Sequence, residues 1–169
     1  MFPEHAYAER RGMELGLAED AYNAGNRYHA RRTREIGAIF REVLGRERVV
    51  VLLAGQSDYP PSADEMLAWN GTAADVDAIA TAPYFGFELG LSDSAAAVGR
   101  MTLDELFREL ETKTLPQTLA YVAEFAVIAR RHGLPLITYE AGQHLCNLDG
   151  EKDPKVEALF DAANRDPRM

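Results

Sequence analysis

Polar side chains that could do chemistry follow three apolar runs of the sequence. The three groups are Gln56, Ser57 and Asp58; Tyr84, Phe85 and Glu88; and Glu140, Gln143 and His144. In parallel α/β proteins the working groups gather at the carboxyl ends of strands, which is where each of these groups is expected. Glu140 comes directly after Leu-Pro-Leu-Ile-Thr-Tyr, so its charge needs compensating partners or a ligand. We therefore take Glu140 as the leading candidate.

Each leading residue has a functional and a structural interpretation. Glu140 is either a reactive carboxylate or a loop-facing glutamate paired with a cation or an amide. Tyr84 either donates a hydrogen bond that keeps a carboxylate ionised or is a core tyrosine with a satisfied hydroxyl. Trp69 either stacks on a sugar or packs within its helix beside Met66, three residues earlier.

Other site chemistries lack their sequence patterns. His5, His29, His132 and His144 have no metal-ligand spacing between them, and Cys146 is the single cysteine. No serine-hydrolase elbow, phosphate-binding loop or dinucleotide-binding glycine pattern is present. We therefore expect neither a metal nor a cofactor.

The composition and net charge limit the kinds of partner that the chain is expected to bind. The 169 residues suit one domain, and 47% hydrophobic with 27% charged residues is ordinary for a globular chain. A formal net charge of −9 argues against nucleic acid, and four arginines (Arg27, Arg31, Arg32 and Arg34) are expected on a solvated helix face. No apolar run approaches the roughly 20 residues of a membrane span. The polar segment Met1–Arg11 does not resemble a signal peptide, which leaves localisation open.

The first part of the chain alternates helical and strand patterns. Residues 3–17 are expected to form a helix with a break near Gly16, and residues 21–44 a second helix between an Asp20 cap and Gly45. The β-branched run 48–54 is expected to be a strand buried on both faces. Ser62 is expected to cap a short helix.

The same alternation continues to the end of the chain. Residues 75–82 are expected to form a second strand, followed by a loop to about Gly99. Thr102 should cap a helical region in which Pro116 separates residues 103–115 from 117–132. Residues 134–139 are expected to form a third strand, and Asp153-Pro154 should open a last helix over 156–163. This order predicts a parallel sheet with exposed edge strands.

Three segments together resemble a known family. They are Val49-Val-Val-Leu-Leu-Ala-Gly-Gln56, Asp77-Ala-Ile-Ala-Thr-Ala-Pro-Tyr-Phe-Gly86 and Leu136-Ile-Thr-Tyr-Glu-Ala-Gly-Gln143. Their order and spacing resemble strands five to seven of clan-A glycoside hydrolase-like (β/α)₈ barrels, among them bacterial proteins described as cellulose-binding. The resemblance implies that residues 1–169 are one partial barrel domain, the later part of a complete one.

The resemblance also implies roles for the candidate residues. Glu140 would be the nucleophile of a retaining glycosidase and Tyr84 would orient it, while Gln56, Gln143, His144 and Trp69 would contact the sugar. Retaining hydrolysis needs a second carboxyl group about 5–5.5 Å from the first. The acid/base glutamate of strand four has no counterpart here, so we expect the chain to be inactive alone.

Two alternatives stay open. The chain is a non-catalytic carbohydrate-binding protein, or it is a small α/β domain that forms homo-oligomers through its exposed sheet edges.

Overall fold

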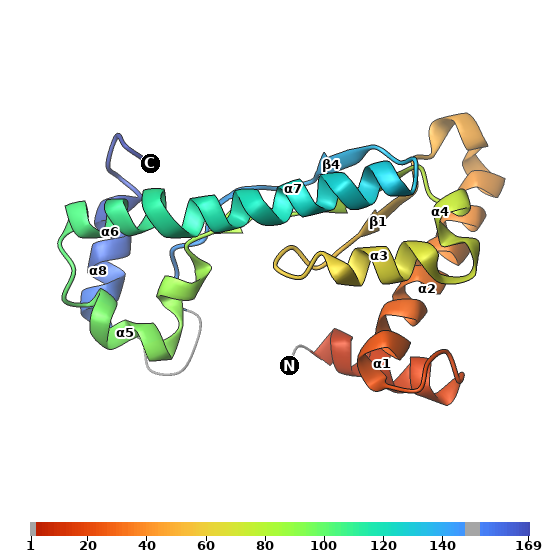
Figure 1. Ribbon diagram of the computed structural model, residues 1–169, viewed down its shortest axis with the longest axis horizontal. Helices are drawn as coiled ribbons and strands as arrows, with labels where there is room; N and C mark the ends of the chain where they lie inside the picture. Colours follow the sequence, from red (N-terminus) through yellow and green to blue (C-terminus); the bar gives the residue numbers. More distant parts are fainter. Residues whose placement is uncertain (1–2, 148–152) are drawn as a thin grey trace. The chain divides into compact units, whose positions relative to one another are not determined.

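The computed structural model describes residues 3–147 and 153–169 and is a mixed α/β structure with parallel strands. The chain divides into two compact units. Unit 1 comprises Met1–Ala82 and Tyr121–Tyr139, and unit 2 comprises Pro83–Ala120 and Glu140–Met169. Each unit has its own cluster of buried apolar side chains. The long helix α7 (Leu115–Arg131) contributes residues to both (Figure 1).

Unit 1 contains a three-stranded parallel sheet in the order β1-β2-β4. Its strands are β1 (Leu52–Ala54), β2 (Ala78–Thr81) and β4 (Leu136–Thr138). Its helical elements are α1 (Pro3–Glu14), α2 (Ala21–Leu44), the 3₁₀ turns η1 (Arg46–Arg48) and η2 (Trp69–Gly71), α3 (Pro61–Ala68), α4 (Thr72–Asp75) and the later part of α7. The three parallel strands expected from the sequence are confirmed, although each is shorter than its apolar run.

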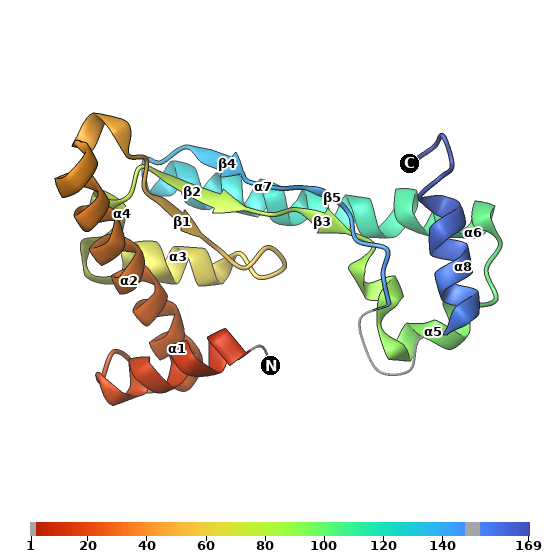
Figure 2. The same cartoon turned by 180° about the vertical axis from the view of Figure 1, so that it is seen from behind.

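Helices cover one face of this sheet. Leu53, Ile79 and Leu136 lie in register across the three strands and belong to the core of unit 1. That core also contains Met66 of α3 and Phe125 of α7, and Figure 2 shows both helices behind the strands. The core is therefore built between the sheet and these helices.

The opposite face of the sheet is open at its margins. Val50, Leu52 and Tyr139 are exposed, and only β2 is buried at every position. No described helix of unit 1 crosses this face in Figure 2. The expectation that the run 48–54 is buried on both faces is therefore wrong: an apolar run shows that a strand prefers burial, but a second layer must exist to provide it.

Helix α2 begins and ends as expected. The Asp20 side chain accepts a hydrogen bond from the backbone of Asn23, and Gly45 ends the helix at a positive φ of 90°. Its arginines are not one solvated face, however. Arg31 pairs with Glu35 along the helix surface, whereas other arginines bind groups on neighbouring elements, namely Arg27 to Glu65 and Arg34 to Asp75.

Unit 2 is mainly helical and carries a two-stranded parallel ladder of β3 (Tyr84–Phe85) with β5 (Gly142–Gln143). Its helices are η3 (Phe87–Gly90), α5 (Ser92–Val98), α6 (Leu103–Glu109), the π-helical turn η4 (Leu110–Thr114), the first part of α7 and α8 (Pro154–Ala163). The caps of α6 at Thr102 and of α8 at Asp153 are confirmed. The expected loop before Gly99 is instead helical, because its alanine run favours helix.

Three further local expectations are wrong. Pro116 does not separate two helices: helical structure runs from α6 through η4 into α7, and the π turn directly before Pro116 accommodates the ring and the missing donor. Ser62 does not cap α3 but lies buried within it, donating to the Tyr59 carbonyl. The second strand begins at Ala78 because α4 extends to Asp75.

No helix among the described residues is long and apolar enough to cross a membrane.

Candidate functional site

A cleft with several polar side chains in its lining lies in unit 1 where β1 and β4 end. It has a volume of about 670 Å³ and is bounded by α1, α2, the loop after β1 and Tyr139. The polar side chains that line it include His5, Glu9, Asn26, His29 and Gln56. This position agrees with the general rule that sites form at the carboxyl ends of parallel strands.

Glycines bring α1 close enough to α2 to form one wall of the cleft. A Cβ atom on Gly12 would lie 2.1 Å from the carbonyl oxygen of Ala24, closer than any real contact. A Cβ atom on Gly25 would lie 3.0 Å from Cγ of Glu9. Since His5 and Glu9 are carried by α1, their place in the cleft depends on this close helix packing.

The loop after β1 is fixed from two sides. The hydroxyl of Tyr22 donates to Oε1 of Gln56 over 3.3 Å, which ties the loop to α2. Oγ of Ser57 accepts hydrogen bonds from the backbone of Ala82 at 3.0 Å and from the hydroxyl of Thr81 at 3.1 Å. The side chain of Gln56 is thus held at the cleft by an ordered loop.

Asn26 lines the cleft and carries an unused donor. Its Nδ2 atom is buried and has no hydrogen-bond partner among residues 3–147 and 153–169. A buried amide donor without a partner costs on the order of 1–3 kcal/mol, and a ligand with an acceptor oxygen would remove that cost. This atom is the strongest indication that the cleft takes a ligand.

His29 favours its neutral form more strongly than a free histidine does. Its pKa is lowered chiefly because the surrounding protein desolvates the charged imidazolium, and the nearby His5 acts in the same direction. A hydrogen bond with the backbone of Ala54 opposes these effects. Neutral His29 can both donate to and accept from a ligand or the backbone.

Sequence reasoning found Gln56 in this cleft but missed His5, Asn26 and His29. The two histidines are 24 positions apart, and no local spacing indicates that α1 folds back on α2. The glycines at positions 12 and 25 were the available signal, because glycine inside a helix is often a point of close packing.

Tyr84 and His144 come together in unit 2. Their rings lie 5.3 Å apart, and Phe87 adds a second aromatic neighbour of His144 at 6.4 Å. The backbone of Tyr84 accepts a hydrogen bond from Thr118, and Oε1 of Gln143 accepts one from the backbone of Leu145 at 2.6 Å. The side-chain carbonyl of Gln143 is therefore occupied by a hydrogen bond within its own turn.

Glu140 lies in the connector between β4 and β5 and is exposed. Among the described residues it makes no hydrogen bond or ion pair. This connector, residues 139–141, is one residue longer than residues 82–83 between β2 and β3. An extra residue in one of two paired strands breaks the alternation of side chains, so strand periodicity does not determine which way Glu140 faces.

Trp69 packs against the core of unit 1 and does not line the cleft. Contact with a sugar by Trp69, Gln143 or His144 stays a prediction.

No group of three or more histidine, cysteine, aspartate or glutamate side chains within the described ranges could hold a metal ion. No protein-family profile matches the chain, and neither a curated protein nor a solved structure is significantly similar to it.

Proposed function

We propose that unit 1 binds a neutral, polyhydroxylated ligand of the carbohydrate class in the cleft at the ends of β1 and β4. The observation that carries the proposal is the buried, unpartnered Nδ2 donor of Asn26. A hydroxyl or ring oxygen of a sugar is an acceptor of the right kind, and a cleft of about 670 Å³ is in the range that holds small ligands.

The remaining lining supports a neutral ligand. Gln56 offers an amide and Tyr22 a hydroxyl, while the exposed ring of Tyr139 offers an apolar face for the C–H groups of a sugar. Neither lysine nor arginine is among the described lining residues, so a phosphate or carboxylate would find no cation. Glu4 and Glu9 would also repel an anion.

We further propose that the parallel sheet of unit 1 is part of a (β/α)₈-barrel-like sheet. The support is its strand–helix alternation together with its one covered face, since the uncovered face of a barrel segment would line the barrel interior.

Isothermal titration calorimetry tests ligand binding directly. Cellotetraose is the first probe from a panel of neutral oligosaccharides, and inorganic phosphate is the anionic comparison. Asn26→Ala should lower the affinity about 10-fold, the effect of one lost hydrogen bond of roughly 1.4 kcal/mol. The same variant should unfold at the same or a higher denaturant concentration, because it removes an unpaired donor.

Asn164→Ala, at the exposed carboxyl end of α8, is the matched control and should bind as the native chain does. Binding of phosphate in preference to every neutral sugar would contradict the proposal, as would undiminished oligosaccharide binding by Asn26→Ala.

A second proposal is retaining hydrolysis of O-glycosidic bonds in a complete barrel, with Glu140 as the nucleophile and Tyr84 as the group that orients it. One observation favours it: Glu140 lies two residues after the end of β4 and is open to solvent, so a substrate could reach it. The second carboxyl group would have to come from outside this chain, so the chain alone should not turn over substrate.

Covalent labelling distinguishes the two proposals. A 2-deoxy-2-fluoroglycoside forms a stable ester with a retaining nucleophile, and mass spectrometry of peptides would locate it. An adduct on Glu140 that disappears in Glu140→Gln supports hydrolysis. Oligosaccharide binding without any adduct leaves only the binding function.

A further inference from the structure

Strand β1 has an unpaired edge. The carbonyl of Val51 accepts from Asp77 at 2.8 Å and the amide of Gly55 donates to Ala80 at 3.0 Å, so both point toward β2. Backbone groups of successive strand residues alternate in direction, and those of Val50, Leu52 and Ala54 therefore point to the other edge. His29 bonds the backbone of Ala54, whereas Val50 and Leu52 face no described strand.

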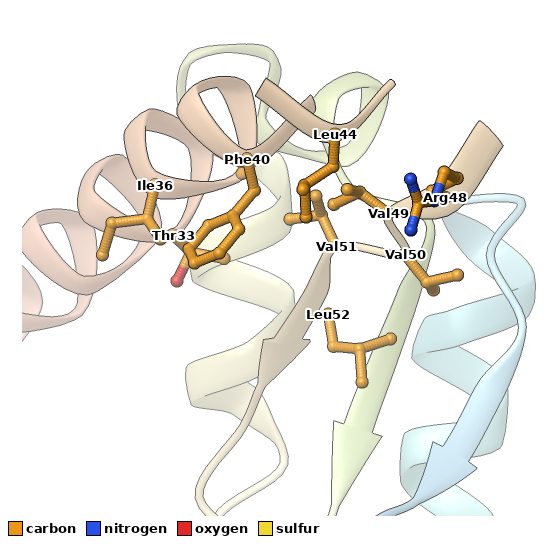
Figure 3. Close-up of a pocket in the computed structure, with 10 residues that line it drawn as sticks. Thr33, Ile36, Phe40, Leu44, Arg48, Val49, Val50, Val51 and Leu52 are labelled. Atoms are coloured by element: carbon orange, nitrogen blue, oxygen red, sulfur yellow. The ribbon is translucent and has the colours of Figure 1, made fainter. Parts of the chain in front are cut away.

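An apolar groove runs along this edge. It has a volume of about 480 Å³ and lies between α2 and the segment that leads into β1. Figure 3 shows Ile36, Phe40 and Leu44 of α2 on one side and Val50 and Leu52 on the other. All five are exposed, with Val50 at 70% and Phe40 at 53%. Together they form one exposed apolar surface, and surfaces of this kind often mark interaction sites.

The two ends of the edge carry opposite charges. Arg48 stands at the start of the segment and Asp58 just beyond its end, and the residues between them are uncharged. Neither Arg48 nor Asp58 forms an ion pair within the described part of the chain. A parallel neighbour of the same sequence would set like charges side by side, whereas an antiparallel neighbour brings Arg48 of one copy toward Asp58 of the other.

We propose that the edge of β1 pairs antiparallel with β1 of a second copy of this chain, forming a two-fold symmetric dimer. The proposal rests on the sheet edge and not on the ligand cleft. It is an alternative to the barrel-like sheet proposed above, because a further barrel strand would occupy the same edge of β1. A two-fold axis makes the same patch meet itself, which requires a self-complementary surface, and the charge order of residues 48–58 supplies it. The apolar groove would form the centre of an interface that needs roughly 800 Å² per copy.

Each element of the interface has a defined contribution. In the register that sets Arg48 opposite Asp58, the free amide and carbonyl groups of Leu52 would pair with Ala54 of the second copy, whose backbone also bonds His29. Those of Val50 would pair with Gln56 of the second copy. Phe40 and Leu44 would be removed from water by the partner strand. The ion pairs at the two ends would determine the antiparallel orientation, because the opposite orientation places like charges together.

Sedimentation equilibrium of the full chain tests the dimer. We expect a monomer–dimer equilibrium for the native chain. Arg48→Glu and Asp58→Arg should each weaken the dimer about 10-fold, corresponding to about 1.4 kcal/mol for the two symmetric ion pairs together. The double variant Arg48→Glu/Asp58→Arg should restore the native dissociation constant to within about 3-fold, since the charges are exchanged and not lost.

Two control variants separate the edge from a general effect of charge. Arg100→Glu alters the net charge in unit 2 as Arg48→Glu does in unit 1 and should leave the dimer unchanged. Val50→Lys should abolish dimerisation, whereas Leu119→Lys, at an exposed position of α7, should not. Circular dichroism would verify that each variant is folded.

Three outcomes would overturn the proposal. A native chain that stays monomeric at several hundred micromolar would mean that the groove serves another partner or none. Failure of the double charge exchange to restore association would exclude the antiparallel arrangement. A dimer that survives Val50→Lys would place the interface elsewhere.

Discussion

At the scale of single residues, the cleft depends on polar groups held in defined states. Asn26 carries a donor with no partner among the described residues, and the pKa of His29, beside the backbone of Ala54, is lowered. A donor without a partner destabilises the free protein slightly and becomes useful only when a ligand arrives. At such a residue, the unpaired donor that favours ligand binding also lowers the stability of the free protein.

His29 predicts a specific pH dependence. Its pKa is lowered in the folded protein, so the unfolded chain binds the proton more readily than the folded chain does. The contribution of neutral His29 is fully present above its ordinary pKa of 6.5 and is lost as the pH falls through the lower, folded value.

Urea unfolding measured from pH 8 to pH 5 checks this expectation. The advantage of the native chain over His29→Gln should shrink on acidification, because glutamine keeps a donor for the Ala54 backbone but does not titrate. A constant difference across this pH range would contradict a lowered pKa.

A second residue-scale prediction concerns Arg41. Its side chain is 13% exposed, its Nη2 atom binds Asp77 at 2.6 Å, and its Nη1 atom donates to the Asp75 carbonyl. Asp77 also accepts the amide of Val51, and that hydrogen bond, with Arg41, lowers its pKa. Arg41→Met should reduce the free energy of unfolding by roughly 1–2 kcal/mol, because it removes the hydrogen bonds that the half-buried guanidinium donates to Asp75 and Asp77.

Arg31→Met is the matched control for Arg41→Met. Arg31 pairs with Glu35 on the exposed surface of the same helix, where such pairs contribute about 0.3–0.5 kcal/mol. Equal losses from the two variants in urea unfolding would show that the Arg41 network has no special role.

At the scale of elements, the packing of α1 on α2 builds the cleft. Gly12→Ala places a methyl group against the carbonyl of Ala24, so α1 must shift or detach. We expect a loss of roughly 1–3 kcal/mol in unfolding free energy and a loss of cellotetraose binding, since His5 and Glu9 move with α1. Met13→Ala, at an exposed neighbouring position, should change neither the unfolding free energy nor cellotetraose binding. Native binding by Gly12→Ala would contradict the role of α1.

In the helical segment from α6 to α7, the preference of Pro116 for a helix boundary competes with the packing of the preceding turns. Pro116 favours a helix boundary on steric grounds, yet α7 begins at Leu115 and continues to Arg131. The buried residues Leu106, Phe107 and Leu110 hold the preceding turns in the core of unit 2, and the π turn absorbs the proline. Packing that extends over several turns outweighs the preference of one residue.

At the scale of the whole molecule, each of the two units has its own hydrophobic core. Phe125 lies in the cluster of unit 1 and Phe160 in that of unit 2, and the two clusters share no residue. Phe125→Ala and Phe160→Ala should each cost about 3–5 kcal/mol in the unit concerned. Calorimetric melting should therefore depart from a single two-state transition when either core is weakened.

Ligand binding distinguishes the two variants. The proposed cleft belongs to unit 1, so Phe160→Ala should still bind cellotetraose below its first melting transition, whereas Phe125→Ala should not. Loss of binding in both variants would show that the two units fold as one.

The sequence by itself determined the features that depend on near neighbours or on a repeated period. These include the α2 cap at Asp20, the capping box at Thr102 and the three parallel strands in chain order. Of the six predicted site residues, only Gln56 lines the cleft.

Only the tertiary structure decided which distant residues meet and which faces stay open. His5 joins His29 because two helices cross at glycines, and the outer face of β1 is exposed because no described layer covers it. The hydrogen bonds of helix caps and the period of helices and strands involve residues a few positions apart, so a single sequence reveals them. The packing of distant segments depends on the shapes of both partners, and in this sequence its only signal was the pair of glycines at positions 12 and 25.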